Sequence, residues 1–306
     1  MKRLFLILLQ VVTAVGTLSA QSPALYTAEQ SGADQIVTNI WNNTTAPHSN
    51  GITVDENINH KLDLENSTQT DLYIYKADKS IATGQGVVVV PGGGYYKLSM
   101  LYDGFKIAQY LRSIGVTAIV VKYRLPNGVR EVPIEDAIAI LRYMREQADC
   151  LGIEPQQVGM LGCSAGGHLV ALATHTLAVE ERPKFNILIY PSTSGDMWSN
   201  YRLQNCFERL TGKWRTQVDI ENNSCENLVS TTTPPTLLMH THEDTTVPST
   251  ASTLYYKALK RYGVRAALYL FPAGAHGWAG HDEWEYAAPA KRAIADWLEI
   301  ERQRPN

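Results

Sequence analysis

Short apolar segments alternate with amphipathic segments through most of the chain. The segment GVVVVPGGG, residues 86–94, begins with a run of β-branched residues, which is typical of a strand buried on both faces. The next segment, YDGFKIAQYLRSIG, has helical spacing and ends at Gly115, and VTAIVVKYR at 116–124 predicts a second buried strand. Strands that alternate with helices in this order form a mostly parallel sheet with helices on both faces. We therefore predict an α/β fold.

The same alternation continues towards the end of the chain. IEDAIAILRYMREQA, after Pro133, predicts an amphipathic helix, and further helices are expected from about Ser249 and from Ala287. The other predicted strands are QVGMLGCS, FNILIYP, TLLMH and AALYLF, and DLYIYKA at 71–77 alternates as an edge strand does. Residues 191–235 form a long polar segment that interrupts the alternation, and we interpret it as an insertion over one end of the sheet.

The first twenty residues have the features of a secretory signal peptide. Lys2 and Arg3 are positively charged, Leu4 to Val15 is almost wholly apolar, and small residues around Ala20 predict cleavage before Gln21. The apolar run is shorter than the roughly 20 residues that span a bilayer. We therefore expect a secreted or periplasmic protein with no membrane contact after cleavage of the signal.

The rest of the chain divides into a polar N-terminal extension at 21–60, expected to wrap on the domain, and one large α/β domain at 61–306. The net charge is −3, and no basic stripe is present, which argues against a nucleic-acid partner. The four cysteines lack metal-ligand spacing, so no metal is expected. Whether Cys206 and Cys225 pair in an oxidising compartment stays open.

The segment LGCSAGGH places one serine between glycines directly after an apolar strand. Ser164 lies between Gly162 and Gly166 in the pattern G-x-S-x-G. In a nucleophile elbow this pattern turns a strand sharply into a helix and exposes the serine hydroxyl above the sheet. A glycine-rich turn at a helix start is the alternative, so the pattern needs partners at the same edge of the sheet.

A serine nucleophile needs a base and an acid, and two loops after later strands supply them. The loop after TLLMH contains Glu243 and Asp244, and the loop after AALYLF contains His276 between glycines. We favour Asp244 as the acid because of its position before Val247, with Glu243 as the alternative. The chain order Ser164, Asp244, His276 is that of an α/β-hydrolase. Of the other histidines, His168 is interpreted as a packing or solvent-facing residue.

The loop PGGGY after the strand at 86–90 predicts an oxyanion hole. Backbone N–H groups must face the negative oxygen that develops during acyl transfer. We assign Gly93 and Gly94 of this loop, together with Ala165 of the elbow, as the donors. A phosphate-binding glycine loop is disfavoured, because no lysine follows at Walker spacing and no G-x-G-x-x-G occurs in the loop.

These segments resemble the secreted α/β-hydrolase acetylesterases that are related to acetylxylan esterases and, more distantly, to the hormone-sensitive-lipase group. The matching segments are VVVVPGGGYYKLS, IVVKYRL, PIEDAIAILRYMREQA, VGMLGCSAGGHL, CENLVSTTTPPTLLMHTHEDTTVP and FPAGAHGW. The resemblance implies an α/β-hydrolase catalytic domain at 61–306 in which Ser164 is the nucleophile, Asp244 the acid and His276 the base. Two features depart from the relatives: Cys163 replaces a bulky apolar residue, and PGGGY lacks the histidine of the lipase HGGG loop.

The resemblance also implies the reaction and the substrate. It indicates a secreted serine carboxylester hydrolase that removes acetyl or other small acyl groups from a polysaccharide such as xylan and requires no cofactor. Feruloyl esterase, general short-chain carboxylesterase and peptidase activities are the alternatives within enzymes, and an inactive binding module is the alternative outside them. Aromatic residues near the edge of the sheet are candidates for sugar contacts or for core packing: Tyr95, Tyr96, Trp198, Trp214 and Trp278.

Overall fold

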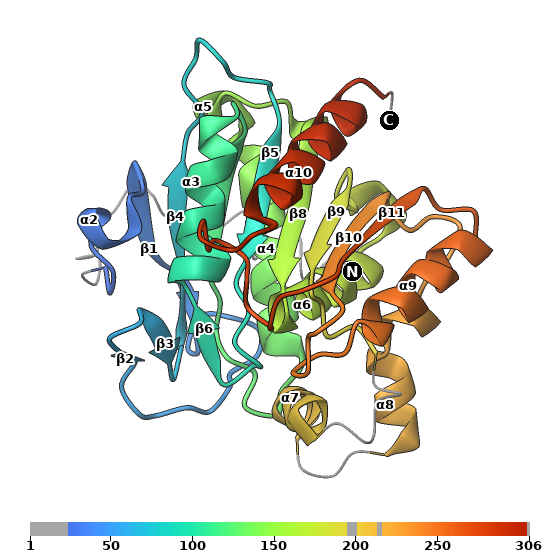
Figure 1. Cartoon of the computed structure of the whole chain (residues 1–306). Coiled ribbons are helices and arrows are strands. Elements are labelled where there is room, and N and C mark those ends of the chain that lie inside the picture. The colour runs from blue at the N-terminus through green and yellow to red at the C-terminus, as the bar shows by residue number, and fades with distance from the viewer. Residues whose placement is uncertain (1–23, 195–200, 213–215, 305–306) are drawn as a thin grey trace.

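A computed structural model describes residues 24–194, 201–212 and 216–304. Within these ranges, eight strands form one twisted sheet (Figure 1). In spatial order the strands are β1 (Gln35–Asn42), β4 (Gln69–Tyr75), β7 (Thr117–Lys122), β5 (Gly86–Val90), β8 (Val158–Cys163), β9 (Asn186–Ile189), β10 (Thr236–Thr241) and β11 (Ala266–Phe271). From β7 to β11 all neighbours are parallel, whereas β4 is antiparallel to both β1 and β7.

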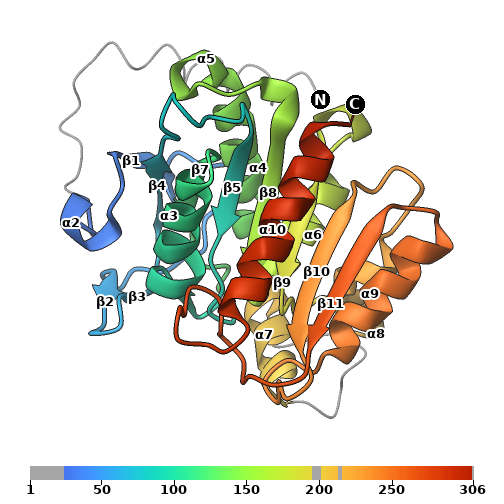
Figure 2. The same cartoon turned by 45° about the horizontal axis from the view of Figure 1, so that its top comes forward.

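Helices cover both faces of this sheet. Helices α3 (Lys106–Ser113) and α10 (Ala287–Arg302) lie on one face, in front of the strands in Figure 2. The other face packs against α4 (Glu131–Glu146), α6 (Ala165–Thr176) and α9 (Thr250–Arg261). The predicted α/β fold is therefore confirmed. None of the helices in the described ranges is long and apolar enough to cross a membrane.

Shorter elements border the end of the sheet at which the parallel strands finish, which we call the carboxyl edge. A small antiparallel sheet consists of β2 (Asn57–Ile58), β3 (Asp63–Glu65) and β6 (Lys97–Ser99). The predicted insertion contains α7 (Tyr201–Thr211), α8 (Gln217–Asn223) and the turn η5 (Cys225–Asn227). The π-helical turn η2 (Leu101–Phe105) also lies at this edge. Short elements elsewhere in the fold are α2 (Ala28–Ser31), α5 (Ala148–Leu151), η3 (Pro155–Gln157) and η4 (Val179–Glu181).

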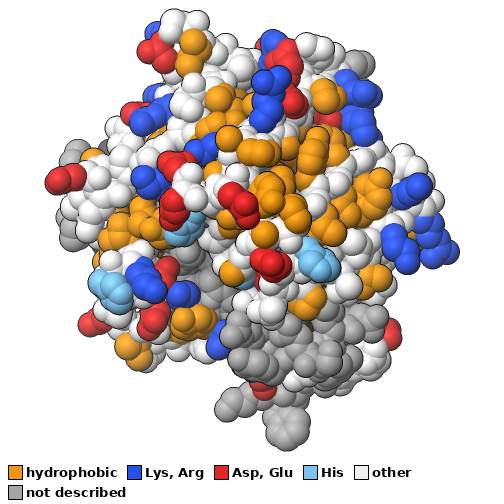
Figure 3. Space-filling model, in the orientation of Figure 1, with side chains coloured by type: hydrophobic (Ala, Val, Ile, Leu, Met, Phe, Trp, Pro, Cys, Tyr) orange, Lys and Arg blue, Asp and Glu red, His pale blue; other side chains and the backbone are white. Residues whose placement is uncertain are grey.

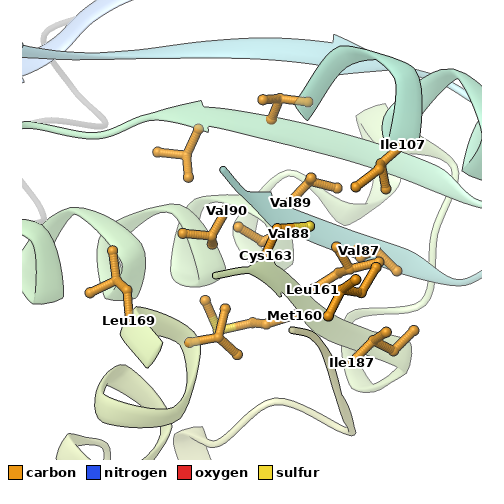
Figure 4. Close-up of a cluster of buried hydrophobic side chains, with 14 of the residues drawn as sticks. Val87, Val88, Val89, Val90, Ile107, Met160, Leu161, Cys163, Leu169 and Ile187 are labelled. Atoms are coloured by element: carbon orange, nitrogen blue, oxygen red, sulfur yellow. The ribbon is translucent and has the colours of Figure 1, made fainter. Parts of the chain in front are cut away.

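The core is built from the apolar runs that predicted the strands. All five residues of β5 and all six of β8 are buried, because helices cover the sheet on both sides. Figure 4 shows the side chains of Val87–Val90 in β5 in one buried cluster with Leu161 of β8 and Ile187 of β9. The register pairs Val90 with Gly162, and Cys163 with Ile189, so that these strands end level with one another. The loops that follow them are consequently brought together at the carboxyl edge.

Two predicted elements differ from the structure. DLYIYKA does not form an edge strand: β4 is buried on both faces and lies between β1 and β7. Its outer neighbour β1 belongs to residues 21–60, the segment expected as an extension, so this segment contributes a strand to the main sheet. Helix α4 begins at Glu131, two residues before Pro133, because a proline in the first helical turn loses no helical hydrogen bond. The predicted signal peptide at 1–20 lies outside the described residues.

Two glycines that follow helices allow a matched test of the packing around the sheet. Gly115 and Gly263 both have a positive φ, 81° and 69°, after α3 and α9. A Cβ atom at Gly115 would lie 2.1 Å from the Ile81 carbonyl oxygen, whereas nothing lies within 4 Å of one at Gly263. We expect Gly263→Ala to cost about 1 kcal/mol of unfolding free energy, and Gly115→Ala to cost at least about 2 kcal/mol more because of the collision. Urea unfolding measures the free energy of unfolding of both variants. Equal losses of stability in the two variants would contradict the expected collision with the Ile81 carbonyl oxygen.

Candidate active site

Ser164 lies at the turn between β8 and α6. Its backbone has φ 52° and ψ −121°, a strained conformation for a residue with a side chain. Three backbone hydrogen bonds hold the turn: the Ser164 N–H donates to the Ile189 carbonyl at 2.9 Å, and the Ser164 carbonyl accepts from the N–H groups of His168 at 3.1 Å and Ser192 at 3.2 Å. The residue is 8% exposed. The hydroxyl group therefore reaches the surface on a rigidly held backbone.

The glycines on either side of Ser164 are required by the packing of the turn. A Cβ atom at Gly162 would lie 2.3 Å from the Gly166 carbonyl oxygen, and one at Gly166 would lie 2.1 Å from the Val90 carbonyl oxygen. No real Cβ atom approaches a backbone oxygen so closely, so a side chain at either position would force the helix away from the sheet. The G-x-S-x-G pattern is explained by this contact between α6 and β5.

His276 approaches Ser164 from the loop after β11. The distance from His276 Nε2 to Ser164 Oγ is 2.9 Å. Gly274 and Gly277, on either side of the histidine, have φ values of 127° and 88°, which only glycine adopts readily. The loop thereby delivers the imidazole to the serine, as the two flanking glycines in the sequence indicated.

Asp244 orients the imidazole from the loop after β10. Its Oδ2 atom lies 2.6 Å from His276 Nδ1, and its Oδ1 atom accepts hydrogen bonds from the N–H groups of Thr246 and Val247. Burial raises the pKa of Asp244, but the hydrogen bonds from His240 and His276 prevail and hold it well below its ordinary value. The ionised carboxylate can only accept, so the hydrogen of His276 is on Nδ1. Nε2 is then free to accept the proton of the Ser164 hydroxyl.

The alternative residues are not placed to form this series. Glu243 is exposed and accepts a hydrogen bond from the Gly274 N–H at 3.1 Å, so it braces the loop of His276 without touching the imidazole. His240 is buried and approaches Asp244 from the other side, with its Nε2 atom 3.3 Å from Asp244 Oδ2 and 2.8 Å from the Val247 carbonyl oxygen. Sequence analysis did not identify this second histidine beside the carboxylate.

The loop PGGGY faces Ser164 with unused backbone donors. Gly93 and Gly94 have φ values of 128° and 62°, and neither N–H group donates to another described residue. Ala165 is the first residue of α6, where an N–H group has no partner within the helix. Gly93, Gly94 and Ser164 all line one cleft. Two of the three predicted donors, Gly93 and Gly94, thus line the cleft of Ser164, and the third, Ala165, follows Ser164 in the chain.

Residues 87–280 match the family model described as the alpha/beta hydrolase fold. The chain belongs to the α/β-hydrolase family. It is similar to an acetylxylan esterase of Xylanibacter ruminicola, with 32% identity over 226 residues, or 71% of this chain and 45% of that protein. It is also 30% identical to endo-1,4-beta-xylanase B of Butyrivibrio fibrisolvens over 207 residues, or 62% of this chain and 32% of the xylanase. The hydrolase thus spans less than half the length of these two relatives.

A solved structure agrees with the sequence comparison. The acetyl ester-xyloside bifunctional hydrolase of Caldicellulosiruptor lactoaceticus superposes with a TM-score of 0.69 at 30% identity, over 83% of this chain and 94% of the other. The predicted α/β-hydrolase fold and the resemblance to acetylxylan esterases are confirmed.

A buried carboxyl group that the sequence analysis did not identify links the two loops that meet at Ser164. Asp103 in η2 accepts a hydrogen bond from the Tyr190 hydroxyl at 2.8 Å and one from the Gly92 N–H at 3.3 Å. The Tyr190 hydroxyl in turn accepts from the Ala279 N–H at 3.2 Å, and the Tyr190 ring lies against His276 with 4.7 Å between ring centroids. Burial raises the pKa of Asp103. This network fixes the PGGGY loop relative to the loop that contains His276.

A second buried network joins the PGGGY loop to the insertion. His168 Nε2 lies 2.6 Å from the Asn223 carbonyl oxygen, to which it can only donate, so Nδ1 accepts from the Tyr95 hydroxyl at 2.9 Å. His168 is fully buried, so the packing interpretation is confirmed and the solvent-facing one is wrong. The sequence feature that indicates the burial of His168 is its position one helical turn after Ser164, on the face of α6 that meets the PGGGY loop.

The buried His168 makes the stability of the hydrolase dependent on pH. Burial lowers the pKa of His168 to about 4. The unfolded chain, with a pKa near 6.5, binds more protons between these values, so stability is full above pH 6.5 and falls by about 3 kcal/mol as the pH approaches 4. His168→Gln keeps a donor for Asn223 without the titration, and its stability should fall less between pH 7 and pH 4.5. Urea unfolding at both pH values tests this, and an unchanged pH dependence in the variant would contradict it.

The cleft in front of Ser164 has a volume of about 720 Å³ and is bordered by the small sheet, η2, α7 and the His276 loop. Over the small sheet, Lys, Arg and His side chains lie among Asp and Glu side chains (Figure 3). Of the aromatic candidates, Tyr96 lines the cleft and is 45% exposed, whereas Tyr95 and Trp278 are buried and pack in the core. Trp198 and Trp214 lie outside the described residues.

The cysteines of the insertion are free thiols in this structure. Cys206 in α7 and Cys225 in η5 are both buried and do not pair. Burial raises the pKa of Cys206 to about 11 and that of Cys225 well above its ordinary value, so neither thiol is reactive at neutral pH. Among the described residues, no group of three or more His, Cys, Asp or Glu side chains is arranged to hold a metal ion.

Proposed function

We propose that the chain is a serine carboxylester hydrolase that removes acetyl groups from xylan or related polysaccharide fragments through an acyl-enzyme. The observation that supports this most directly is the hydrogen-bonded series Ser164, His276 and Asp244, which opens into a cleft lined by the PGGGY loop. Similarity to an acetylxylan esterase and to an acetyl ester-xyloside hydrolase supports the acyl group and the sugar.

The geometry supports the following acylation step. Ser164 Oγ attacks the ester carbonyl carbon while His276 Nε2, at 2.9 Å, takes the hydroxyl proton. The N–H groups of Gly93, Gly94 and Ala165 stabilise the negative oxygen of the tetrahedral intermediate. The bond to the sugar oxygen then breaks, and His276 returns the proton to that oxygen. The products are the free sugar hydroxyl and an acetyl group on the serine.

Deacylation uses the same groups with water in place of the sugar. His276 takes a proton from the water as its oxygen attacks the acetyl carbonyl, and the proton then passes to Ser164 Oγ as acetate leaves. Asp244 stays ionised throughout and stabilises the positively charged imidazole at 2.6 Å. The carboxylate therefore orients the base without receiving its proton.

The reaction is tested by acetate release from acetylated xylan, with acetylated pectin, a feruloyl ester and p-nitrophenyl acetate assayed in parallel. We expect release of acetate from acetylated xylan and rapid turnover of p-nitrophenyl acetate. Turnover of p-nitrophenyl acetate alone would exclude xylan and leave a general short-chain carboxylesterase. Preferential cleavage of the feruloyl ester would replace the acetyl assignment, and inactivity on every ester would indicate a binding module.

We also propose that the chain is exported and cleaved after Ala20. The charged residues Lys2 and Arg3 followed by the apolar run Leu4 to Val15 support this proposal. Expression of the full-length chain with N-terminal sequencing of the secreted product tests it. Gln21 is the expected first residue, and retention of Met1 in a cytoplasmic product would contradict export.

A further inference from the structure

Three cationic side chains line the same cleft as Ser164. Lys61 lies in the turn between β2 and β3, Lys97 is the first residue of β6, and Arg209 lies in α7 of the insertion. These segments are far apart in the sequence, and the fold brings their positive charges into one cleft. The chain as a whole is acidic, with a net charge of −3. The cleft therefore differs in charge from the protein that contains it.

Negative groups in the cleft do not balance these cations. Asp63 is paired with Lys97, at 2.6 Å between carboxylate oxygen and Nζ. Asp103 is buried, and its carboxyl oxygens accept hydrogen bonds from the Tyr190 hydroxyl and the Gly92 N–H. Within the described ranges, Lys61 and Arg209 form no ion pair with a carboxylate. Lys61 and Arg209 are thus cationic groups of the cleft that pair with no carboxylate in the described ranges.

Arg209 lies directly against the oxyanion loop. Its Nη1 atom donates to the Gly94 carbonyl at 3.2 Å, and the guanidinium group lies over the ring of Tyr96, with 4.6 Å from Cζ to the ring centroid. The Gly94 carbonyl accepts from one of the five N–H donors that a guanidinium group has. A planar guanidinium held in this way can bind both oxygens of a carboxylate.

We propose that the cleft recognises a carboxylate group on the ester substrate, through Arg209 and Lys61. This inference rests on the proposed esterase function and specifies its substrate class: acylated sugar chains that contain uronic acid, with an acidic acyl group as the other source of the same carboxylate. Charge-assisted hydrogen bonds of this kind, made partly shielded from water, should favour the acidic substrate at least tenfold in kcat/KM.

The test compares substrates that differ only in the carboxylate. One pair is acetylated xylan with uronic acid side groups and the same polymer after reduction of its carboxyl groups. The other pair is p-nitrophenyl hydrogen succinate and p-nitrophenyl butyrate, which have acyl chains of equal length. The wild type should prefer the acidic member of one pair at least tenfold, and the pair that shows the preference identifies the sugar or the acyl group as its source. Added salt should reduce the preference, because it screens charges in an open cleft.

Substitutions of the two cations test whether the preference for the acidic substrate arises in the cleft. Lys61→Gln should reduce the preference several-fold, and Arg209→Gln should reduce it further. Lys79→Gln, in an exposed loop at the opposite end of β5, is the matched control and should keep the wild-type preference. Equal kcat/KM values within both pairs, or a preference that survives Lys61→Gln and Arg209→Gln together, would overturn the inference. Failure of the esterase proposal is distinct, because no ester would then be hydrolysed at all.

Discussion

Ser164→Ala is expected to lower kcat on p-nitrophenyl acetate by about four to six orders of magnitude. The change removes the only atom that can form the acyl-enzyme, while the cleft, the oxyanion donors and His276 stay in place. The remaining rate would come from substrate binding and electrostatic stabilisation of a water-mediated reaction. The measurement is steady-state hydrolysis by protein prepared free of contaminating wild type.

Two controls accompany this variant. Thermal unfolding should show an intact fold, because the strained turn is held by backbone hydrogen bonds to the Ile189 carbonyl and from the His168 N–H, which the substitution does not touch. A fluorophosphonate probe should label the wild type and not Ser164→Ala. Retention of more than about one hundredth of the wild-type kcat would contradict the assignment of Ser164 as the nucleophile.

Asp244→Asn is expected to lower kcat by about four orders of magnitude. The carboxylate accepts the hydrogen on His276 Nδ1 at 2.6 Å, which leaves Nε2 unprotonated towards Ser164. An amide in this place can donate its own N–H to Nδ1, so the hydrogen of the imidazole moves to Nε2, where it blocks proton transfer from the serine. The loss therefore comes from the wrong tautomer and occurs without displacement of the ring.

The neighbouring carboxylate provides the matched control for Asp244→Asn. Glu243 is exposed and bonds only the Gly274 N–H of the histidine loop, so Glu243→Gln should change kcat less than tenfold. Both variants remove one negative charge from the same loop, and the comparison thus separates orientation of the base from general electrostatics. A severe loss in Glu243→Gln together with a mild one in Asp244→Asn would reverse the assignment of the acid.

Local sequence patterns were sufficient to predict the parts of the fold that depend on local chemistry. The apolar side chains of Val87–Val90 are all removed from water only where both faces of the strand are covered. The glycines around Ser164 are required because a Cβ atom at either position would lie 2.1 or 2.3 Å from a backbone oxygen. Parallel strands end at one edge, and the loops containing Asp244 and His276 were therefore predicted to meet the serine.

Features that depend on long-range pairing could not be predicted in this way. β4 lies inside the sheet because β1 (Gln35–Asn42) pairs with its outer edge. The side chains of β1 show no regular alternation of buried and exposed positions. Asp103 occurs in a segment that shows only helical spacing, and its bonds to Tyr190 and Gly92 join loops distant in the sequence. Spacing along the chain contains no information about such contacts, because they arise only when separate elements pack together.

Trapping of the acyl-enzyme tests directly whether Ser164 is the nucleophile. With p-nitrophenyl acetate the leaving group is good, so acylation should outpace deacylation and the acetyl intermediate should accumulate. Acid quenching after a brief reaction, followed by mass spectrometry of the peptides, locates the acetyl group. We expect one acetyl group on Ser164, and we expect none in protein that is quenched before substrate is added. Full turnover with no acetylated peptide, or with the acetyl group on another residue, would contradict it.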